Sequence, residues 1–276
     1  MSSSIAIARL EKEADAGASR PPHAEFLGLP FCLLSRQQAI RLIIDRCGAP
    51  YRYVITPNAF DVVTAHDNPA QLLPIYRGAW LSLCDSRVIR ALARLRGHLL
   101  PLVTGSDLVP TLLATLNTAD PALGLRKVLV VGPPRATAAA LRAVYPNVAL
   151  DVLPAPAGLA RDAALRHAVA RACVEQTWDI LLICLGAPAQ GLIAARIAEL
   201  GRGGGVALCV GAAVDFLTGA SVRAPLWLQR LHLEWAYRLA REPRRLWRRY
   251  LVDSPKVFRI FMTTHSARGR SRTRTR

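Results

Sequence analysis

The stretch "DILLICLGAPAQ", residues 179–190, decides the fold class of this chain. It opens with an apolar run as short as a buried strand and passes through Gly and Pro into a helix-like segment. Similar runs occur in "YRYVIT" (51–56), "AWLSLC" (79–84), "KVLVVG" (127–132) and "GVALCVG" (205–211). Helical stretches flank or separate the runs at 35–47, 59–77, 86–97, 106–118, 135–145, 159–176 and 189–201. The alternation predicts an α/β fold, with a Rossmann-like, mostly parallel sheet covered by helices on both faces.

Polar residues follow the carboxyl ends of four expected strands. They are Asn58, Asp85, Gln190 and Asp215, in chain order. In an open parallel sheet, ligands bind outside the carboxyl ends of the strands. We therefore expect these four side chains to surround one crevice.

Asp85 is the strongest single candidate, because it directly follows an apolar strand. A carboxylate with little access to water can act as a general base, since desolvation raises its pKa toward neutrality. The alternative is structural: Asp85 could cap the helix that starts near Ser86. The sequence alone does not decide between these two roles, and the other three residues have structural alternatives as well.

The motifs of several common sites are missing. No G-x-G-x-x-G follows a strand, and "GRGGG" (201–205) precedes one, as a helix-to-strand turn does. A P-loop, G-x-S-x-G, C-x-x-C and D-x-D are also absent. We expect no cofactor and no metal, so arginines and backbone amides would have to stabilise a diphosphate leaving group. The scattered cysteines favour a reduced, cytoplasmic chain.

Positive charge is concentrated near the C-terminus. The 276 residues carry a formal net charge of +17, and residues 223–276 contain 15 basic and 3 acidic side chains. This balance indicates an anionic partner, which could be nucleic acid, anionic lipid or a diphosphate. No uncharged run is long enough to span a membrane.

A helix is expected to begin at Pro243, because proline is tolerated in the first turn of a helix. At 100° per residue, Arg245, Arg248 and Arg249 share one face, and the opposite face is apolar and includes Trp247. Such a helix could pack its apolar face on the core or on a partner chain. It could also lie in a membrane interface with its arginines toward phosphates.

A long series of residues in the C-terminal half resembles the WecG/TagA/CpsF family of bacterial glycosyltransferases. The series consists of Val210-Gly211, Asp215-Phe216, Gly219, Arg223-Ala224-Pro225, Trp227, Leu233-Glu234-Trp235, Arg238-Leu239, Glu242-Pro243, Arg245-Leu246 and Arg249-Tyr250-Leu251. Thr56 and Asn58 match the T-x-N segment of the family, and Thr104-Gly105-Ser106-Asp107 resembles its G-x-D turn. The similarity extends from about Phe26 to Leu251.

The resemblance implies transfer of a sugar from a UDP-sugar to a polyprenyl-diphosphate-linked sugar, with inversion and without a metal. Asp85 matches the catalytic aspartate. The substrate-binding set is then Thr56, Asn58, Gln190, Gly132, Gly186, Gly211 and Asp215. The set for the lipid diphosphate or membrane is Arg223, Arg238, Arg245, Arg248, Arg249 and Trp247.

Three segments depart from the family pattern. Its Asp-Gly is Asp85-Ser86 in this chain, its P-K-Q-E segment is Pro188-Ala189-Gln190-Gly191, and its Gly before Leu-Glu-Trp is His232. The second change removes a lysine that could offset the charge of UDP.

The predicted organisation has four parts: a disordered tail (1–24), an α/β glycosyltransferase domain (25–222), a helical membrane- and acceptor-binding appendage (223–262) and a basic disordered tail (263–276). The leading hypothesis is a hexosyltransferase of surface-polysaccharide assembly, peripheral on the inner face of the cell membrane. The alternative is a basic nucleic-acid-binding protein on an inactive α/β domain, which is disfavoured because no groove-reading motif is present. The sequence leaves a homo-oligomer open.

Overall fold

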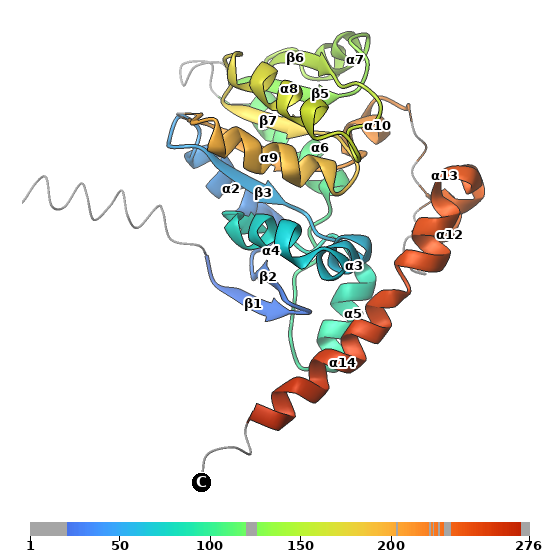
Figure 1. Cartoon of the computed structure of the whole chain (residues 1–276). Helices are drawn as coiled ribbons and strands as arrows, with labels where there is room; N and C mark the ends of the chain where they lie inside the picture. Colours follow the sequence, from blue (N-terminus) through green and yellow to red (C-terminus); the bar gives the residue numbers. More distant parts are fainter. Residues whose placement is uncertain are drawn as a thin grey trace, which may run out of the picture.

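The computed structural model describes residues 21–119, 126–202, 204–220, 222, 224, 225, 227, 228 and 233–271, with side chains described up to residue 264. Six parallel strands form the central sheet in the order β4-β3-β8-β7-β5-β6. Figure 1 shows the sheet with helices around it. The bounds of the strands are β3 (Arg52–Ile55), β4 (Leu81–Ser82), β5 (Lys127–Gly132), β6 (Ala149–Pro154), β7 (Ile180–Ile183) and β8 (Val206–Cys209). The predicted α/β class is confirmed.

The five predicted strands are all present and lie next to one another in the sheet, in the order β4-β3-β8-β7-β5. Val54 of β3 is paired with Leu81 of β4 on one side and with Leu208 of β8 on the other, and β8 is paired in turn with β7. The carboxyl ends of β4, β3, β8 and β7 are therefore adjacent along one edge of the sheet.

Each face of the sheet carries its own hydrophobic core, because successive strand residues point to opposite faces. In β7, Leu181 and Ile183 belong to one core, and Ile180 and Leu182 to the other. The helices that contribute to the first core are α3 (Ala59–Asp67), α4 (Pro69–Gly78), α5 (Arg87–Leu95), α8 (Ala163–Val174), α9 (Ala189–Glu199) and α14 (Lys256–Ser271). Those of the second are α2 (Arg36–Asp45), α6 (Gly105–Asn117), α7 (Thr137–Val144) and α10 (Ala213–Leu217).

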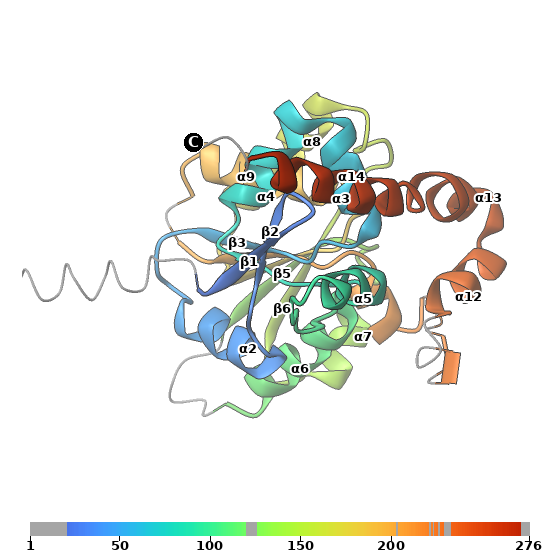
Figure 2. The same ribbon diagram turned by 90° about the horizontal axis from the view of Figure 1, so that it is seen from below.

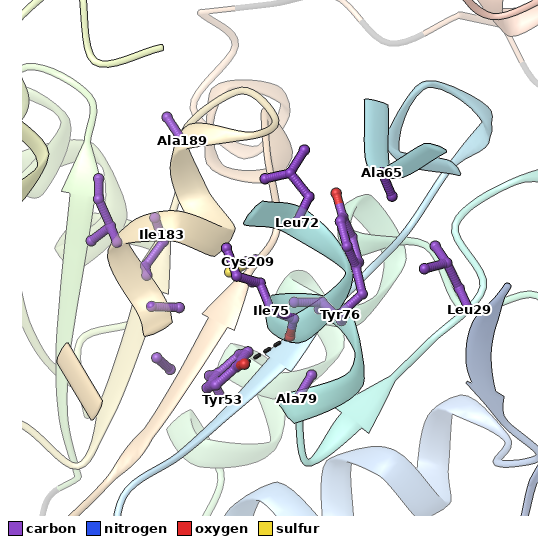
Figure 3. Close-up of a cluster of buried hydrophobic side chains, with 14 of the residues drawn as sticks. Leu29, Tyr53, Ala65, Leu72, Ile75, Tyr76, Ala79, Ile183, Ala189 and Cys209 are labelled. Carbon is purple, nitrogen blue, oxygen red and sulfur yellow. Dashed lines mark hydrogen bonds between the residues drawn. The ribbon is translucent and has the colours of Figure 1, made fainter. Parts of the chain in front are cut away.

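Figure 3 shows part of the first core, where α4 packs on β3 and β8. The hydroxyl of the buried Tyr53 donates a hydrogen bond to the carbonyl of Ile75 at 2.7 Å. This bond satisfies the one polar atom of an otherwise apolar side chain, so Tyr53 ties β3 to α4 without a cost in buried polarity.

Three local features differ from the sequence-based expectation. β6 was not predicted, because "ALDVLP" is half-exposed at the sheet edge and its apolar run is interrupted by Asp151. The helix expected over 59–77 is divided into α3 and α4 at Asn68, where Pro69 starts the second helix. A hairpin of β1 (His23–Phe26) and β2 (Leu29–Cys32) begins inside the range predicted as a tail, and residues 1–20 lie outside the described residues.

The C-terminal segment consists of α12 (Glu234–Arg241), α13 (Pro243–Trp247), the π-helical turn η2 (Arg248–Asp253) and α14 (Lys256–Ser271). It leaves the sheet and returns along the molecule, so that α14 lies beside α3 and near α5 (Arg87–Leu95) (Figures 1 and 2). α14 continues beyond Met262, into the range where the sequence predicted a disordered tail; residues 272–276 are outside the described part.

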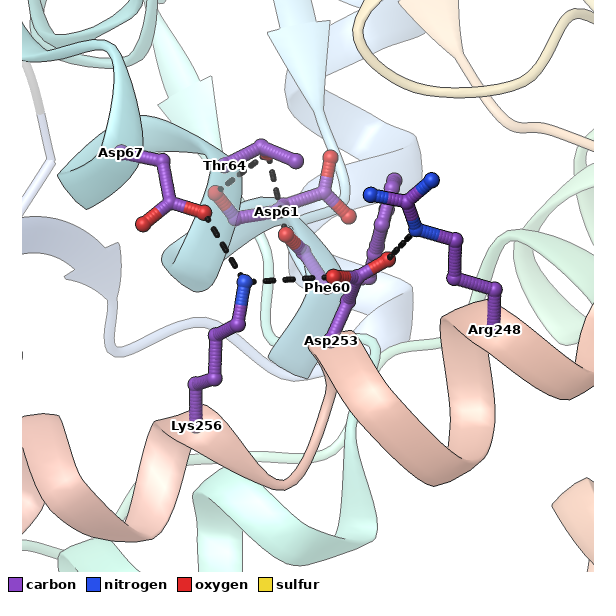
Figure 4. Close-up of polar contacts among 7 residues, drawn as sticks. All are labelled: Phe60, Asp61, Thr64, Asp67, Arg248, Asp253 and Lys256. Atoms are coloured by element: carbon purple, nitrogen blue, oxygen red, sulfur yellow. Dashed lines mark hydrogen bonds and ion pairs between the residues drawn. The ribbon is translucent and has the colours of Figure 1, made fainter.

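Buried apolar contacts and ion pairs hold α14 on the domain. Val257 and Ile260 are buried in the first core. Lys256 bridges Asp253, at 3.2 Å, and Asp67 of α3, at 3.5 Å (Figure 4). The returning chain therefore places α12, α13 and η2 over the carboxyl edge of the sheet.

The predicted separation of arginine and apolar faces over residues 244–251 is not what the structure shows. A helix does begin at Pro243, but it changes into a π-helical turn at Arg248, where the step of 100° per residue no longer applies. Leu246 is buried, whereas Trp247 is exposed. Arg249 turns toward the same cavity as Tyr250.

Candidate active site

A cavity of about 630 Å³ lies outside the carboxyl ends of β4, β3, β8 and β7, under the C-terminal segment. The structure brings most of the predicted site residues to its wall. Those that line it are Thr56, Asn58, Asp85, Gly186, Gln190, Gly211, Asp215, Arg238, Arg245 and Arg249. Residues from four strand ends and from the C-terminal helices thus share one space.

Asp85 lies between the end of β4 and α5, and it does not cap the helix. Ser86 does so, because its side chain accepts a hydrogen bond from the backbone N–H of Ile89 at 3.2 Å. The Asp85 carboxylate instead accepts from the N–H of Gly105 at 3.4 Å, and its remaining surface faces the cavity. Of the two roles that the sequence left open, the capping role belongs to the neighbouring serine.

The protein around Asp85 raises its pKa to about 8. Desolvation by burial is the largest cause, because a charged carboxylate loses its hydration there. The hydrogen bond from Gly105 opposes this effect, the negative charges of Glu234 and Asp61 add to it, and the positive charge of Arg238 opposes it. Near neutral pH, Asp85 is thus poised to take up and release a proton, as a general base must.

The side chains of Thr56 and Asn58 form hydrogen bonds within the protein at the cavity wall. The Thr56 hydroxyl donates to the carbonyl of Cys209 at 2.9 Å and so joins the ends of β3 and β8. Asn58 caps α3, because its side chain accepts from the N–H of Phe60 at 2.9 Å. Both remain in the lining, so the structural and ligand-binding readings are compatible.

Gln190 joins the start of α9 to the loop after β8. Its side-chain oxygen accepts from the N–H of Gly211 at 3.0 Å, and the residue is nearly buried. Gly191, which stands in place of the glutamate of the P-K-Q-E segment, is closely packed: a Cβ atom there would lie 3.2 Å from the side chain of Ile75. A side chain at position 191 would therefore contact α4.

Asp215 on α10 faces the arginines of the C-terminal segment. Burial raises its pKa, while the charges of Arg245 and Arg238 oppose that change and Glu242 reinforces it. The guanidinium of Arg238 also lies over the ring of Phe216, 5.4 Å from its centre. α10 and α12 are therefore linked by charge and by ring contact across the cavity.

Arg249 enters the cavity between aromatic rings. Its guanidinium carbon is 4.8 Å from the centre of the Phe60 ring and 5.8 Å from that of Tyr250. Its Nε is buried without a hydrogen-bond partner among the described residues. A guanidinium positioned by rings, with donors left over, is suited to bind a phosphate.

Other predicted residues do not meet the cavity. Gly132 is a packing residue at the end of β5, since a Cβ atom there would lie 2.7 Å from the carbonyl oxygen of Cys184. Arg248 points away from the site to Asp253, 3.9 Å distant, and Trp247 is exposed outside the lining (Figure 4 shows Arg248). Arg223 lies outside the described residues.

The structure adds two acidic residues that the sequence argument did not select. Asp61 is buried behind the site, where its carboxylate accepts from the hydroxyl of Tyr76 at 2.7 Å and from the N–H of Asn58 at 3.0 Å. Burial raises its pKa. In the sequence, the spacing of Asp61 from Asn58 indicates only a capping box and gives no sign that the charge of Asp61 affects Asp85. Glu234 lines the cavity from α12, and only its place in the "LEW" motif singled it out.

In the part of the chain that the structure describes, no group of three His, Cys, Asp or Glu side chains is arranged to hold a metal ion. None of the helices in that part combines the length and the apolar character needed to cross a bilayer.

Comparison with known proteins identifies the family. No curated protein matches the chain. The family model for glycosyl transferases of the WecG/TagA/CpsF family matches residues 24–271, nearly the whole length. This match includes the sheet, the cavity and the helices that cover it, so the chain belongs to the WecG/TagA/CpsF family of glycosyl transferases.

Proposed function

We propose that this chain transfers a sugar from a UDP-sugar to a polyprenyl-diphosphate-linked sugar, with inversion and without a metal ion. The sugar is a hexose or N-acetylhexosamine, such as glucose, N-acetylmannosamine or its uronic acid. Family membership points to glycosyl transfer in cell-surface polysaccharide biosynthesis. The observation that supports the finer proposal best is Asp85, a desolvated carboxylate in a cavity that four arginines also line, three of them from the C-terminal segment.

Asp85 is the general base of the proposed reaction. It takes the proton of the acceptor hydroxyl while the hydroxyl oxygen forms a bond to C1 of the donor sugar. The bond from C1 to the UDP oxygen breaks, and UDP leaves with the electron pair. A single displacement from the opposite face inverts C1. Asp85 then returns its proton to water.

The arginines of the C-terminal segment stabilise the phosphates. Arg238, Arg245 and Arg249 all line the cavity, and UDP gains negative charge as it leaves. Guanidinium groups bind phosphate through paired hydrogen bonds and remain charged at any working pH. Because they replace a metal ion in this scheme, their loss should weaken both binding and turnover.

Exposed apolar side chains are concentrated in the C-terminal part of the chain. Most of the exposed large apolar residues of the described chain belong to its last part: Val222, Trp227, Leu233, Trp235, Trp247, Leu251, Val252, Phe258 and Met262. Three of them, Trp235, Leu251 and Phe258, also line the cavity. A lipid-linked acceptor could therefore keep its chain in a membrane while its diphosphate enters the site. We place the protein on the inner face of the cell membrane.

The decisive experiment is a transfer assay with purified protein, a panel of UDP-sugars and a short-chain polyprenyl-diphosphate-linked acceptor. We expect transfer from at least one donor, and loss of that transfer in Asp85→Asn. Asp151→Asn is the matched control, because Asp151 is an exposed aspartate on β6, away from the cavity. Absence of transfer with every donor would exclude the proposed activity, and full activity of Asp85→Asn would exclude the assigned base.

A further inference from the structure

Helix α5 presents a basic and apolar surface that the proposed reaction does not use. Leu95 and Leu99, at its end and just beyond, are 76% and 79% exposed, the highest values among the large apolar side chains described. Arg90 and Arg94 are exposed beside them. We call these four residues the α5 face. α5 itself contains no acidic residue, so nothing on the helix neutralises its arginines.

A second hollow adjoins the α5 face. Its volume is about 310 Å³, and its lining consists of Arg90, Arg94, His98, Leu99, Leu100, Pro101 and Leu102. It shares no residue with the active-site cavity. Arg90 and Arg94 are one helical turn apart and so lie on the same side of the helix. The hollow thus combines two neighbouring cations with an apolar wall, which suits a phosphate attached to an apolar group.

Helix α14 is attached to the end of α5. Arg96, just after α5, stacks on the ring of Phe261 at 3.9 Å and donates a hydrogen bond to its carbonyl. The two helices are therefore fixed to each other, and Figure 2 shows both from the same side. Phe258, Arg259 and Met262 of α14 are themselves exposed.

We propose that the α5 face and its hollow bind anionic phospholipid of the membrane, with headgroup phosphates on Arg90 and Arg94 and with Leu95 and Leu99 among the acyl chains. Exposed leucines next to arginines that form no ion pair with any described residue match the two layers of a lipid surface, which are apolar tails and anionic headgroups. A soluble anion would leave the leucines in water, and a purely apolar partner would leave the arginines unpaired. The contact is separate from the C-terminal arginines.

The inference rests on the proposed function in one respect, because a lipid-linked acceptor requires the enzyme to work at a membrane. Arg87, at the start of α5, lines the active-site cavity, and Arg94 is roughly 10 Å further along the helix axis. A lipid contact at the far end of α5 would therefore fix the orientation of the cavity toward the bilayer.

The test is binding of the full-length protein to vesicles of phosphatidylcholine mixed with an equal part of phosphatidylglycerol. The variant is Arg90→Gln/Arg94→Gln. The matched control is Arg135→Gln/Arg161→Gln, which removes the same charge from exposed positions that line neither hollow. Each arginine near an anionic surface contributes about fivefold to binding, so we expect a decrease of about 25-fold in the variant and little change in the control. Leu95→Ser/Leu99→Ser should also weaken binding, and high salt should not abolish this difference.

Turnover separates this inference from the proposed function. With a water-soluble short-chain acceptor, Arg90→Gln/Arg94→Gln should keep the wild-type rate, because neither residue lines the active-site cavity. Equal vesicle binding of variant and control would overturn the lipid contact. A change in oligomeric state with unchanged vesicle binding would also overturn it and would assign the face to a second copy. Absence of transfer by the wild type would instead refute the proposed function alone.

Discussion

Replacement of Asp85 by asparagine tests the central physical claim, which is that a desolvated carboxylate removes the acceptor proton. Asparagine keeps the shape of the side chain and can still accept the hydrogen bond from Gly105, but it cannot take a proton. General bases contribute about 100- to 10,000-fold to enzymatic rates. We expect kcat of Asp85→Asn to decrease by that factor, with little change in KM for the donor.

The pH dependence provides the sharper measurement. Since the pKa of Asp85 is about 8 in the free protein, the ionised fraction is about 1% at pH 6, about 9% at pH 7 and about half at pH 8. The base is the ionised form, so kcat/KM of the wild type should rise roughly tenfold from pH 6 to pH 7 and level off above pH 8. The residual activity of Asp85→Asn should lack this rise.

The free energy of unfolding of the wild type should decrease with rising pH, whereas its activity should increase. The pKa of Asp85 is raised on folding from 3.8 to about 8, so the folded state binds the proton more strongly and loses stability as pH rises through this range. Asparagine removes this penalty. Water in the cavity screens the carboxylate, so the effect is smaller than the full pKa shift implies. We expect Asp85→Asn to stabilise the protein by on the order of 1–2 kcal/mol at pH 8 and not at all near pH 3. Urea unfolding at both pH values measures the difference.

Glu234→Gln is the companion variant, because the negative charge of Glu234 raises the pKa of Asp85. The inflection of kcat/KM should move to lower pH in this variant, while the maximal rate is retained. The reasoning is refuted if the wild-type profile has its inflection near pH 4, or if Asp85→Asn is as active as the wild type.

Four further variants or treatments have defined outcomes. Arg249→Ala should lower kcat/KM for the lipid-linked acceptor by about 10- to 100-fold, because charge-assisted hydrogen bonds are lost, and Arg249→Lys should be intermediate. If titrations of the acceptor give the same kcat/KM for Arg249→Ala and the wild type, Arg249 does not contact a phosphate. Thr56→Val leaves the buried carbonyl of Cys209 without its partner and should cost about 1–2 kcal/mol in urea unfolding, and no cost would mean that water replaces the hydroxyl. Dialysis against EDTA should leave the transfer rate unchanged, whereas a loss restored by Mg²⁺ would contradict the metal-free mechanism. Val257→Asp places a charge in the core and should release α14, seen as faster proteolysis of the C-terminal segment, with Phe258→Asp as the exposed control.

Five of the six strands of the sheet were predictable, because short apolar runs in the sequence mark them. The runs at 51–56, 127–132, 179–186 and 205–211 are continuous and apolar, and β3, β5, β7 and β8 are buried on both faces. β6 lies at the edge with one face in water, so its residues form no such run. The order of the strands could not be predicted from local sequence, because β3 is paired with β8, which lies far from it along the chain.

Many members of the site were predictable, and so was the direction in which burial shifts the pKa of Asp85, but the charged neighbours of Asp85 were not. Strand-end positions pointed to Asp85, Gln190 and Asp215, and the shared cavity contains all three. Gly132 also follows a strand, but the neighbouring chain of Cys184 closes over it. A position at a strand end therefore does not by itself bring a residue into the cavity, because packing decides whether the residue stays accessible.

By itself, the sequence determined the class of the sheet, the residues at its carboxyl edge and the charge of the C-terminal segment, because these depend on neighbours along the chain. Only the tertiary structure decided that Glu234 and Arg238 from α12 would meet Asp85 from the end of β4. It also decided which arginines enter the cavity, since the turn at η2 carries Arg249 inward and leaves Arg248 outside. Burial and distance between remote segments set the pKa of a carboxylate and the reach of a guanidinium, and a linear pattern contains neither quantity.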